Sequence, residues 1–167
     1  MADSTLETLV RRHTEQLRSE SQKTVDWAER TRWWQIRVTD LIGNIETWLA
    51  PLIATGLVKF ERSQLSLSEQ YLGPYTVESA VVSIQTERLK ITPVATIILG
   101  GYGRVDISGP QGRVLLVLAD ADVEPGSSTS RDGAVWYITA LRNRRSMERL
   151  DQAKFEKVFA DLFGIER

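Results

Sequence analysis

The sequence predicts an α+β fold in a single domain, residues 1–167. An antiparallel sheet of five to six strands, arranged as a meander, is expected to pack against a Trp-rich N-terminal helical segment and a C-terminal helix. Apolar residues recur at helical spacing over 1–56, at every second position in short runs over 75–141, and at helical spacing again over 146–164. With 167 residues, 42% of them apolar and 26% charged, the chain has the size and composition of one globular domain.

The first helix is predicted over about residues 5–19. Ser4 and Glu7 have the spacing of a capping box, and apolar side chains follow along one face. His13, the only histidine, lies on that face without an acidic residue placed to orient it, so we expect it to be partly buried and structural rather than catalytic. Residues 19–23 weaken the stripe but contain no Gly or Pro, which leaves open both a break and a continuous helix.

The next helical segment, from Thr24, has the strongest periodicity in the chain. Its main apolar residues recur every seven positions, as in a coiled coil, but further apolar residues widen the stripe and favour packing on a globular core. The helix is expected to weaken near Pro51 and to end before Gly56. The seven-residue series is Trp27, Trp34, Leu41 and Trp48, the residues four positions after its members are Val38, Ile45 and Leu52, and the stripe is widened by Ala28, Ile42 and Leu49.

Short β-rich runs follow Gly73-Pro74. The preceding segment is ambiguous, because 57–61 alternates like a strand whereas 63–72 is compatible with a short helix. Val94–Leu99 is apolar at nearly every position, which predicts a central strand covered on part of both faces. The other predicted strands are Val77–Gln85, Leu89–Pro93, Tyr102–Ser108, Arg113–Leu118 and Ala134–Leu141.

One hairpin has a predictable register. Pro110-Gln111 can form the centre of a turn flanked by Gly109 and Gly112, and pairing of these glycines sets every later pair. One face is then expected to be core and the other half polar. The core face has Val105 opposite Leu116 and Ile107 opposite Val114, and the other face has Arg104 opposite Val117 and Asp106 opposite Leu115.

The C-terminal helix is predicted to start at Ser146 as N-cap and to end before Gly164. Before it, Asp120–Asp132 has the composition of a surface loop, rich in Gly, Ser, Pro and Asp. The helix needs a sheet or another helix to cover its apolar stripe. That stripe comprises Met147, Leu150, Phe155, Val158, Phe159, Leu162 and Phe163.

Composition narrows the classes of function. The 21 Lys and Arg balance 22 Asp and Glu, so no overall field draws the chain to nucleic acid or to an anionic membrane. The absence of cysteine excludes disulfides, thiolate metal sites and cysteine nucleophiles, and fits a reducing compartment; we expect a cytoplasmic protein. No apolar run approaches the roughly 20 residues that span a bilayer, and the N-terminus lacks a secretory pattern, so no membrane association is expected.

Two motifs suggest chemistry only weakly. Asp120, Asp122 and Glu124 alternate, so their carboxylates would share one side of an extended segment, but the spacing is not that of a Ca²⁺ loop. Gly100–Gly103 lacks the Lys-Ser/Thr of a phosphate-binding loop and is followed by a predicted strand, which favours a bend or bulge. We therefore predict no metal, no cofactor and no catalytic residue.

A basic cluster, Arg142, Arg144, Arg145 and Arg149, is the candidate anion-binding site. Positive charge at the start of a helix opposes the helix dipole, so these guanidinium groups are expected to find anions. Local pairing with Glu148 and Asp151 ranks first, an acidic protein surface second and a nucleic acid third, because the total charge is balanced.

The second candidate site is Trp33 with Arg30 and Arg37. Trp33 is rotated about 100° from the seam that contains Trp34, and the two arginines lie three and four residues away on its side. Trp and Arg dominate binding hot spots, so the three residues are predicted to form a partner-binding surface. The competing interpretation is that Trp33 packs against the first helix or an edge of the sheet.

These observations favour a non-catalytic protein-interaction module. It is expected to associate with itself or to act as a small subunit or inhibitor in a larger assembly. Two alternatives stay open: a metal-assisted enzyme that uses the carboxylate cluster, and a nucleic-acid binder that uses the Arg142–Arg149 cluster.

Overall fold

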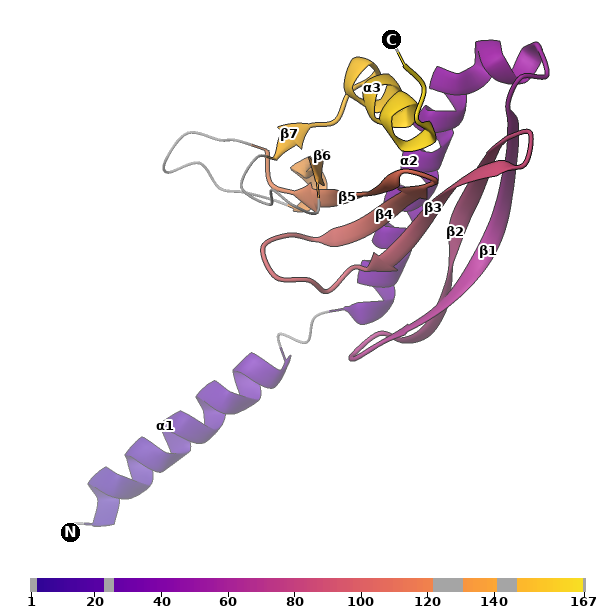
Figure 1. Cartoon of the computed structure of the whole chain (residues 1–167). Helices are drawn as coiled ribbons and strands as arrows, with labels where there is room; N and C mark the ends of the chain where they lie inside the picture. The colour runs from indigo at the N-terminus through magenta and orange to yellow at the C-terminus, as the bar shows by residue number, and fades with distance from the viewer. Residues whose placement is uncertain (1–2, 23–25, 122–130, 141–146, 167) are drawn as a thin grey trace.

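The computed structural model describes residues 3–22, 26–121, 131–140 and 147–166. It shows the predicted α+β fold, with a seven-stranded sheet rather than five or six strands, and with both helical segments in place (Figure 1). The helices are α1 (Asp3–Gln22), α2 (Trp27–Ala54) and α3 (Gln152–Phe163), and the 3₁₀ turn η1 is Arg131–Gly133. The strands are β1 (Lys59–Glu69), β2 (Gly73–Ile84), β3 (Glu87–Ala95), β4 (Gly103–Gly109), β5 (Gly112–Ala119), β6 (Val135–Ala140) and β7 (Glu148–Arg149).

Helix α2 forms as its periodicity predicts and packs on the core. Asp26 caps its start, accepting a hydrogen bond of 3.0 Å from the Glu29 amide, and Gly56 follows its end with a φ of 77° that favours glycine. Trp34 and five other seam residues are buried, which confirms core packing over a free-standing coil. Ala28 and Leu52, expected on the stripe, are exposed instead.

The sheet is a meander in the order β1 to β7, and each strand pairs antiparallel with the next. The predicted β4–β5 register is confirmed, with Gly109 opposite Gly112 and Val105 opposite Leu116. Asp106 and Leu115, on the face expected to be half polar, are also buried. The sheet begins at Lys59, well before the predicted residue 75, because 63–72 forms strand and turn rather than a helix.

Two predictions about the middle and the end of the chain were wrong. Val94–Leu99 is not a central strand: the β3–β4 register shifts between Pro93 and Ala95, and β3 ends at Ala95. The last helix begins at Gln152 rather than near 146, because Asp151 caps it, its side chain accepting from the Lys154 amide at 2.8 Å.

The segment before α3 also differs from the prediction. Glu148 and Arg149 pair with β6 as a short strand, and Met147, expected on the helical stripe, is exposed. Ser146, the predicted N-cap, lies outside the described residues.

Helices α2 and α3 cover the same face of β4. Gly103 faces Trp34 of α2 and Gly109 faces Leu162 of α3, and both glycines lie on the face of β4 that carries Val105 and Ile107. The two helices meet where Trp48 packs against Phe155, with ring centroids 5.5 Å apart. The core therefore lies between this helical layer and the sheet.

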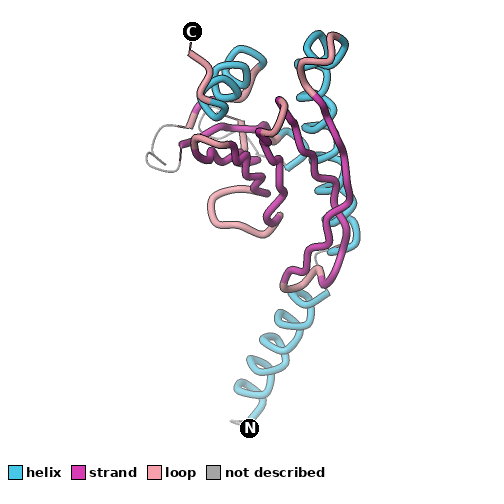
Figure 2. Tube along the Cα trace, turned by 45° about the vertical axis from the view of Figure 1, so that its right-hand side comes forward, coloured by secondary structure: helices cyan, strands magenta, loops and turns pink. Residues whose placement is uncertain are grey.

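Helix α1 projects away from this body (Figures 1 and 2). It starts at Asp3, one residue before the predicted cap Ser4. His13 is exposed, not partly buried, because no described element covers the helix there. None of the described helices is long and apolar enough to cross a membrane.

Candidate interaction surfaces

Trp33 lies in a cluster of cations and aromatic rings within one chain. The guanidinium carbons of Arg30 and Arg131 lie 5.4 Å and 5.0 Å from its ring centroid, and the Tyr102 ring meets it edge-on at 6.1 Å. Arg131 also pairs with Glu29 on α2. Trp33 is thus half-buried against the start of β4 and the η1 turn, and cation–π contact is made inside the monomer.

Arg30 joins α2 to both ends of the loop between β3 and β4. Its Nε donates to Thr96 Oγ1 at 3.1 Å, and its Nη2 donates to the carbonyls of Thr96 and Tyr102 at 3.0 and 3.2 Å. Burial, and then the nearby charge of Arg131, lower the pKa of Arg30. Its Nε and Nη2 donors are used inside the fold, which makes Arg30 an anchor for this loop.

Glu69, at the end of β1, anchors the same loop from the other side. Its carboxylate accepts hydrogen bonds from the amides of Thr96 at 3.1 Å and Ile97 at 3.0 Å, and from the Tyr75 hydroxyl. Burial raises the pKa of Tyr75, and the hydrogen bond to Glu69 adds to the effect. These bonds satisfy backbone donors that a regular strand would have paired with its neighbouring strands, which explains why the apolar run does not continue as a strand.

Arg37 faces a different part of the chain. Its Nη2 donates to the carbonyl of Ala134, between η1 and β6, while its Nε is buried and makes no hydrogen bond within the described residues. The structure therefore brings Arg30 and Trp33 together and engages Arg37 elsewhere. The role of these three residues in binding a partner stays a prediction, and their contacts are also what the competing interpretation, internal packing, expects.

Beyond its anchors, the loop presents apolar side chains to solvent. Leu99 is fully exposed and Ile97 is 40% exposed. Beside them lies a groove of about 490 Å³, on the face of the sheet that carries Arg104 rather than Val105. It is lined by Ile98, Leu99, Gly100, Arg104, Leu115, Val117, Thr139 and Met147. Sequence reasoning missed this surface because the run was assigned to a buried strand.

Asp106 and Asp120 both have hydrogen-bond partners within the fold. Asp106 binds Arg104 through contacts of 2.7 and 3.0 Å and lies 3.4 Å from Arg113, and the Arg104 pKa is raised by its hydrogen bond to Asp106. Asp120 accepts a hydrogen bond from the Tyr102 hydroxyl at 2.8 Å.

The other two carboxylates of the predicted cluster, Asp122 and Glu124, lie outside the described residues. Within the described ranges, no three His, Asp or Glu side chains gather in a way that could hold a metal ion.

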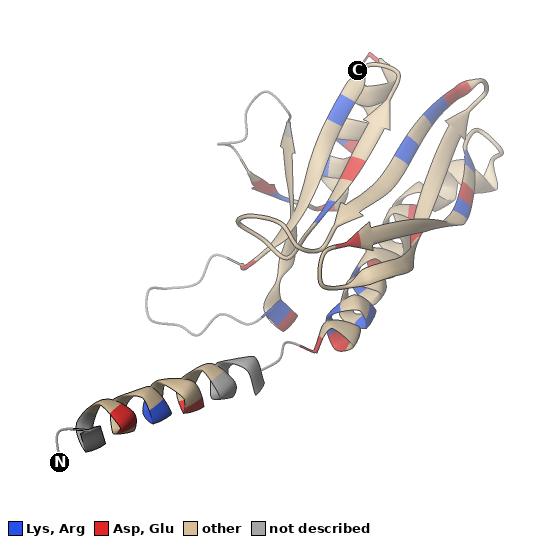
Figure 3. Ribbon diagram, turned by 90° about the horizontal axis from the view of Figure 1, so that it is seen from below, with Lys and Arg blue, Asp and Glu red and all other residues tan. Residues whose placement is uncertain are grey.

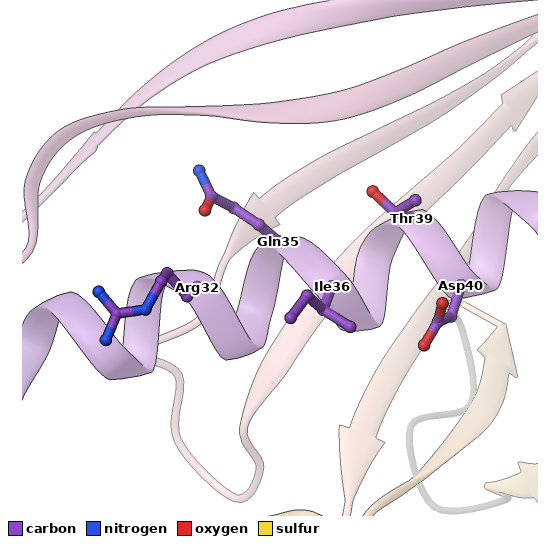
Figure 4. A pocket seen from close by; sticks show the side chains of 5 residues that line it. All are labelled: Arg32, Gln35, Ile36, Thr39 and Asp40. Carbon is purple, nitrogen blue, oxygen red and sulfur yellow. The ribbon is translucent and has the colours of Figure 1, made fainter.

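A second hollow, of about 510 Å³, lies along the outer side of α2 (Figure 4). Gln35 donates to the Thr76 carbonyl at 2.6 Å and Thr39 to Glu78 at 3.0 Å, so these side chains attach the helix to β2. Ile36 is the one apolar side chain among the five that line the hollow, and it is 59% exposed. The hollow brings together no nucleophile and base.

The basic cluster is only partly described. Arg149 is exposed in β7, opposite Tyr137, whereas Arg142, Arg144 and Arg145 lie outside the described residues. Glu148, one of the two predicted local partners, lies 3.7 Å from Lys154. Asp151, the other, caps α3. Anion binding by the cluster stays a prediction.

Comparisons with protein-family models, with curated proteins and with solved structures find no match to this chain.

Proposed function

We propose that this protein is a non-catalytic interaction module that joins another protein through α1. The observation that carries the proposal is the apolar stripe of α1, which no described residue covers. Leu6, Leu9, Val10 and Leu17 are between 53% and 68% exposed on a helix that projects from the folded body (Figure 2). An amphipathic helix of this kind docks with its apolar stripe in a groove of a partner.

The energetics of an isolated helix support a docking role. Helices of up to about 15 residues are marginal in water, and most helical stability in proteins comes from packing of an apolar face. Helix α1 has 20 residues and no described tertiary packing for its stripe. Burial of each Leu or Val contributes roughly 1.5–3 kcal/mol, so a partner groove would supply the stabilisation that the body does not.

The pattern favours a groove over a second copy of the same helix. A two-stranded coil through Leu6, Val10 and Leu17 would place His13 in the middle of its seam, where burial of the imidazole is costly. The stripe is also shorter than the three to four heptads that a coiled coil usually needs.

A protein partner is favoured over a membrane surface. Interfacial helices are rich in Lys and Arg on their polar face, because anionic lipids attract them. On α1, Glu7 and Glu15 stand beside Arg11 and Arg12, so acidic and basic residues alternate along it (Figure 3). Glu7 and Arg11 also pair with each other at 2.8 Å.

Two neighbouring substitutions test the proposal. Leu9→Asp places a carboxylate in the apolar stripe, whereas Thr8→Asp places the same group on the opposite face of the helix. Partners would be captured from the source cell with wild-type protein, identified, purified and titrated against each variant. Loss of an interface anchor costs about 2 kcal/mol or more, so Leu9→Asp should weaken binding about thirtyfold while Thr8→Asp retains it. Equal binding by both variants would refute docking through α1.

A further inference from the structure

Strand β1 forms an open edge of the sheet (Figure 1). It pairs with β2 along all eleven residues from Lys59 to Glu69 without a register shift. No described strand lies on its other side, so the backbone N–H and C=O groups that point outward from β1 have no partner in the sheet. The opposite edge is β7, which has only two residues.

The middle of β1 lacks the features that usually protect an edge strand. Proteins blunt such edges with charged residues, proline, bulges or very short strands. Residues 63–68 read Ser-Gln-Leu-Ser-Leu-Ser, with no charge, proline or glycine, and charged side chains occur only toward the two ends of the strand. Ser66 and Ser68 are exposed, so small polar side chains leave the backbone edge accessible.

We propose that β1 pairs antiparallel with β1 of a second copy of this chain, joining two sheets across a two-fold axis. An unpaired edge is satisfied by another strand, and two identical strands related by a two-fold axis run antiparallel. The dimer uses β1 and the proposed partner binding uses α1, so the two proposals rest on different elements (Figure 2).

Charge selects the register. A two-fold axis at Gln64 uses the full length of the strand and places Lys59 of one copy opposite Glu69 of the other. Lys59 lies 2.8 Å from Glu61 and Glu69 accepts hydrogen bonds from the β3–β4 loop, so this pair adds to contacts that each residue makes in its own chain. The same register places Arg62 opposite Ser66. Moving the axis to Leu65 would instead bring Glu61 opposite Glu69, which repel each other. Opposite charges at the ends and an uncharged middle therefore make the strand self-complementary about Gln64.

The first test is cross-linking. Because the chain has no cysteine, a single introduced cysteine reports one position without background. In the proposed register, Gln64→Cys faces its own copy at the distance that a disulfide requires, so mild oxidation should give a covalent dimer. Thr47→Cys, on an exposed turn of α2, is the matched control and should stay monomeric under the same oxidation.

The second test uses opposite charges at one exposed site. In the dimer, Ser66→Lys would face Arg62 of the other copy, and Ser66→Glu would compete for this guanidinium group with its partners Glu46 and Glu78, which lie 3.1 and 2.7 Å away. Two such pairs form per dimer, but each Arg62 is already paired, so the dissociation constants of the two variants should differ about threefold at low salt, with the Lys variant weaker. Sedimentation across a concentration series measures both, and urea denaturation of each variant verifies that the fold is retained.

The results separate the two proposals. A Gln64→Cys dimer together with weaker association of Ser66→Lys supports β1 pairing. A wild-type chain that sediments as a monomer at every concentration, or a dimer that Ser66→Lys leaves unchanged, overturns it. Leu9→Asp should keep the dimer while losing the partner; if it dissociates the dimer and Ser66→Lys does not, self-association uses α1 and the β1 inference is wrong.

Discussion

Gly103→Ala should strongly destabilise the fold, because Trp34 occupies the space that a methyl group would need. A Cβ at Gly103 would lie 2.1, 2.6 and 2.8 Å from three atoms of the Trp34 ring, far inside ordinary contact distance. The ring cannot move aside easily, since Trp34 is fully buried and packs against Trp136 with centroids 6.1 Å apart. The backbone at Gly103 does not have a positive φ, so the cost is steric.

The expected magnitude follows from core overpacking. Extra methyl groups in packed cores cost about 1–3 kcal/mol, and three ring contacts this short place Gly103→Ala near 3 kcal/mol. With a urea m value of about 2 kcal/mol/M, the unfolding midpoint should fall by about 1.5 M. Gly133→Ala is the control: no atom lies within 4 Å of its added Cβ, so its midpoint should stay close to wild type.

A double-mutant cycle isolates the contact. Trp34→Leu removes the ring, so Gly103→Ala in that background should cost about 1 kcal/mol or less, a coupling of about 2 kcal/mol. Urea titrations of the four proteins measure this coupling. If Gly103→Ala unfolds at the wild-type midpoint, or costs the same with and without the Trp34 ring, the close approach of β4 to α2 is wrong.

Two further predictions concern Tyr75 and Trp33. The pKa of Tyr75 is raised above its unfolded value of 10.0, so its contribution to stability is present below about pH 10 and is lost as pH rises beyond it. Tyr75→Phe should therefore lower stability at neutral pH, because Glu69 loses a donor, but flatten the decline measured by urea titration above pH 10. Trp33→Ala should cost about 1–2 kcal/mol, less than the 3–5 kcal/mol expected for Trp34→Ala, because Trp33 is half-buried and two cations contact its ring. Equal denaturation midpoints for the two tryptophan variants would contradict this ranking.

Local patterns predicted the parts of the fold in which neighbouring residues decide the structure. The β4–β5 register followed from one turn, because Gly109 and Gly112 set every later pair. The seam of α2 followed from a seven-residue periodicity, sustained along a helix of 28 residues, that a single core can bury. In both cases the residues that determine the structure lie within the element itself.

The errors arose where distant residues compete with local preference. Val94–Leu99 has a strand-like composition, but the Glu69 carboxylate and the Arg30 guanidinium, 27 and 66 residues from Thr96, bind the chain there and hold it as a loop. Likewise, the spacing of Arg30 and Trp33 predicted their proximity, whereas Tyr102 and Arg131 reach the same ring from the β3–β4 loop and η1. No local sequence pattern predicts such contacts between residues that are far apart in the chain.

The contact between α2 and α3 has a consequence for folding during synthesis. Consecutive strands of the meander can pair as they leave the ribosome, since each needs only its neighbour. Trp48, by contrast, cannot make its ring contact until Phe155, more than a hundred residues later, has been synthesised. The β4–β5 turn likewise lacks its bond to α3 until then, because the Gln111 amide donates to the Leu162 carbonyl at 2.9 Å. Until α3 is made, the nascent chain carries a formed sheet with an exposed apolar end, the kind of intermediate that chaperones bind.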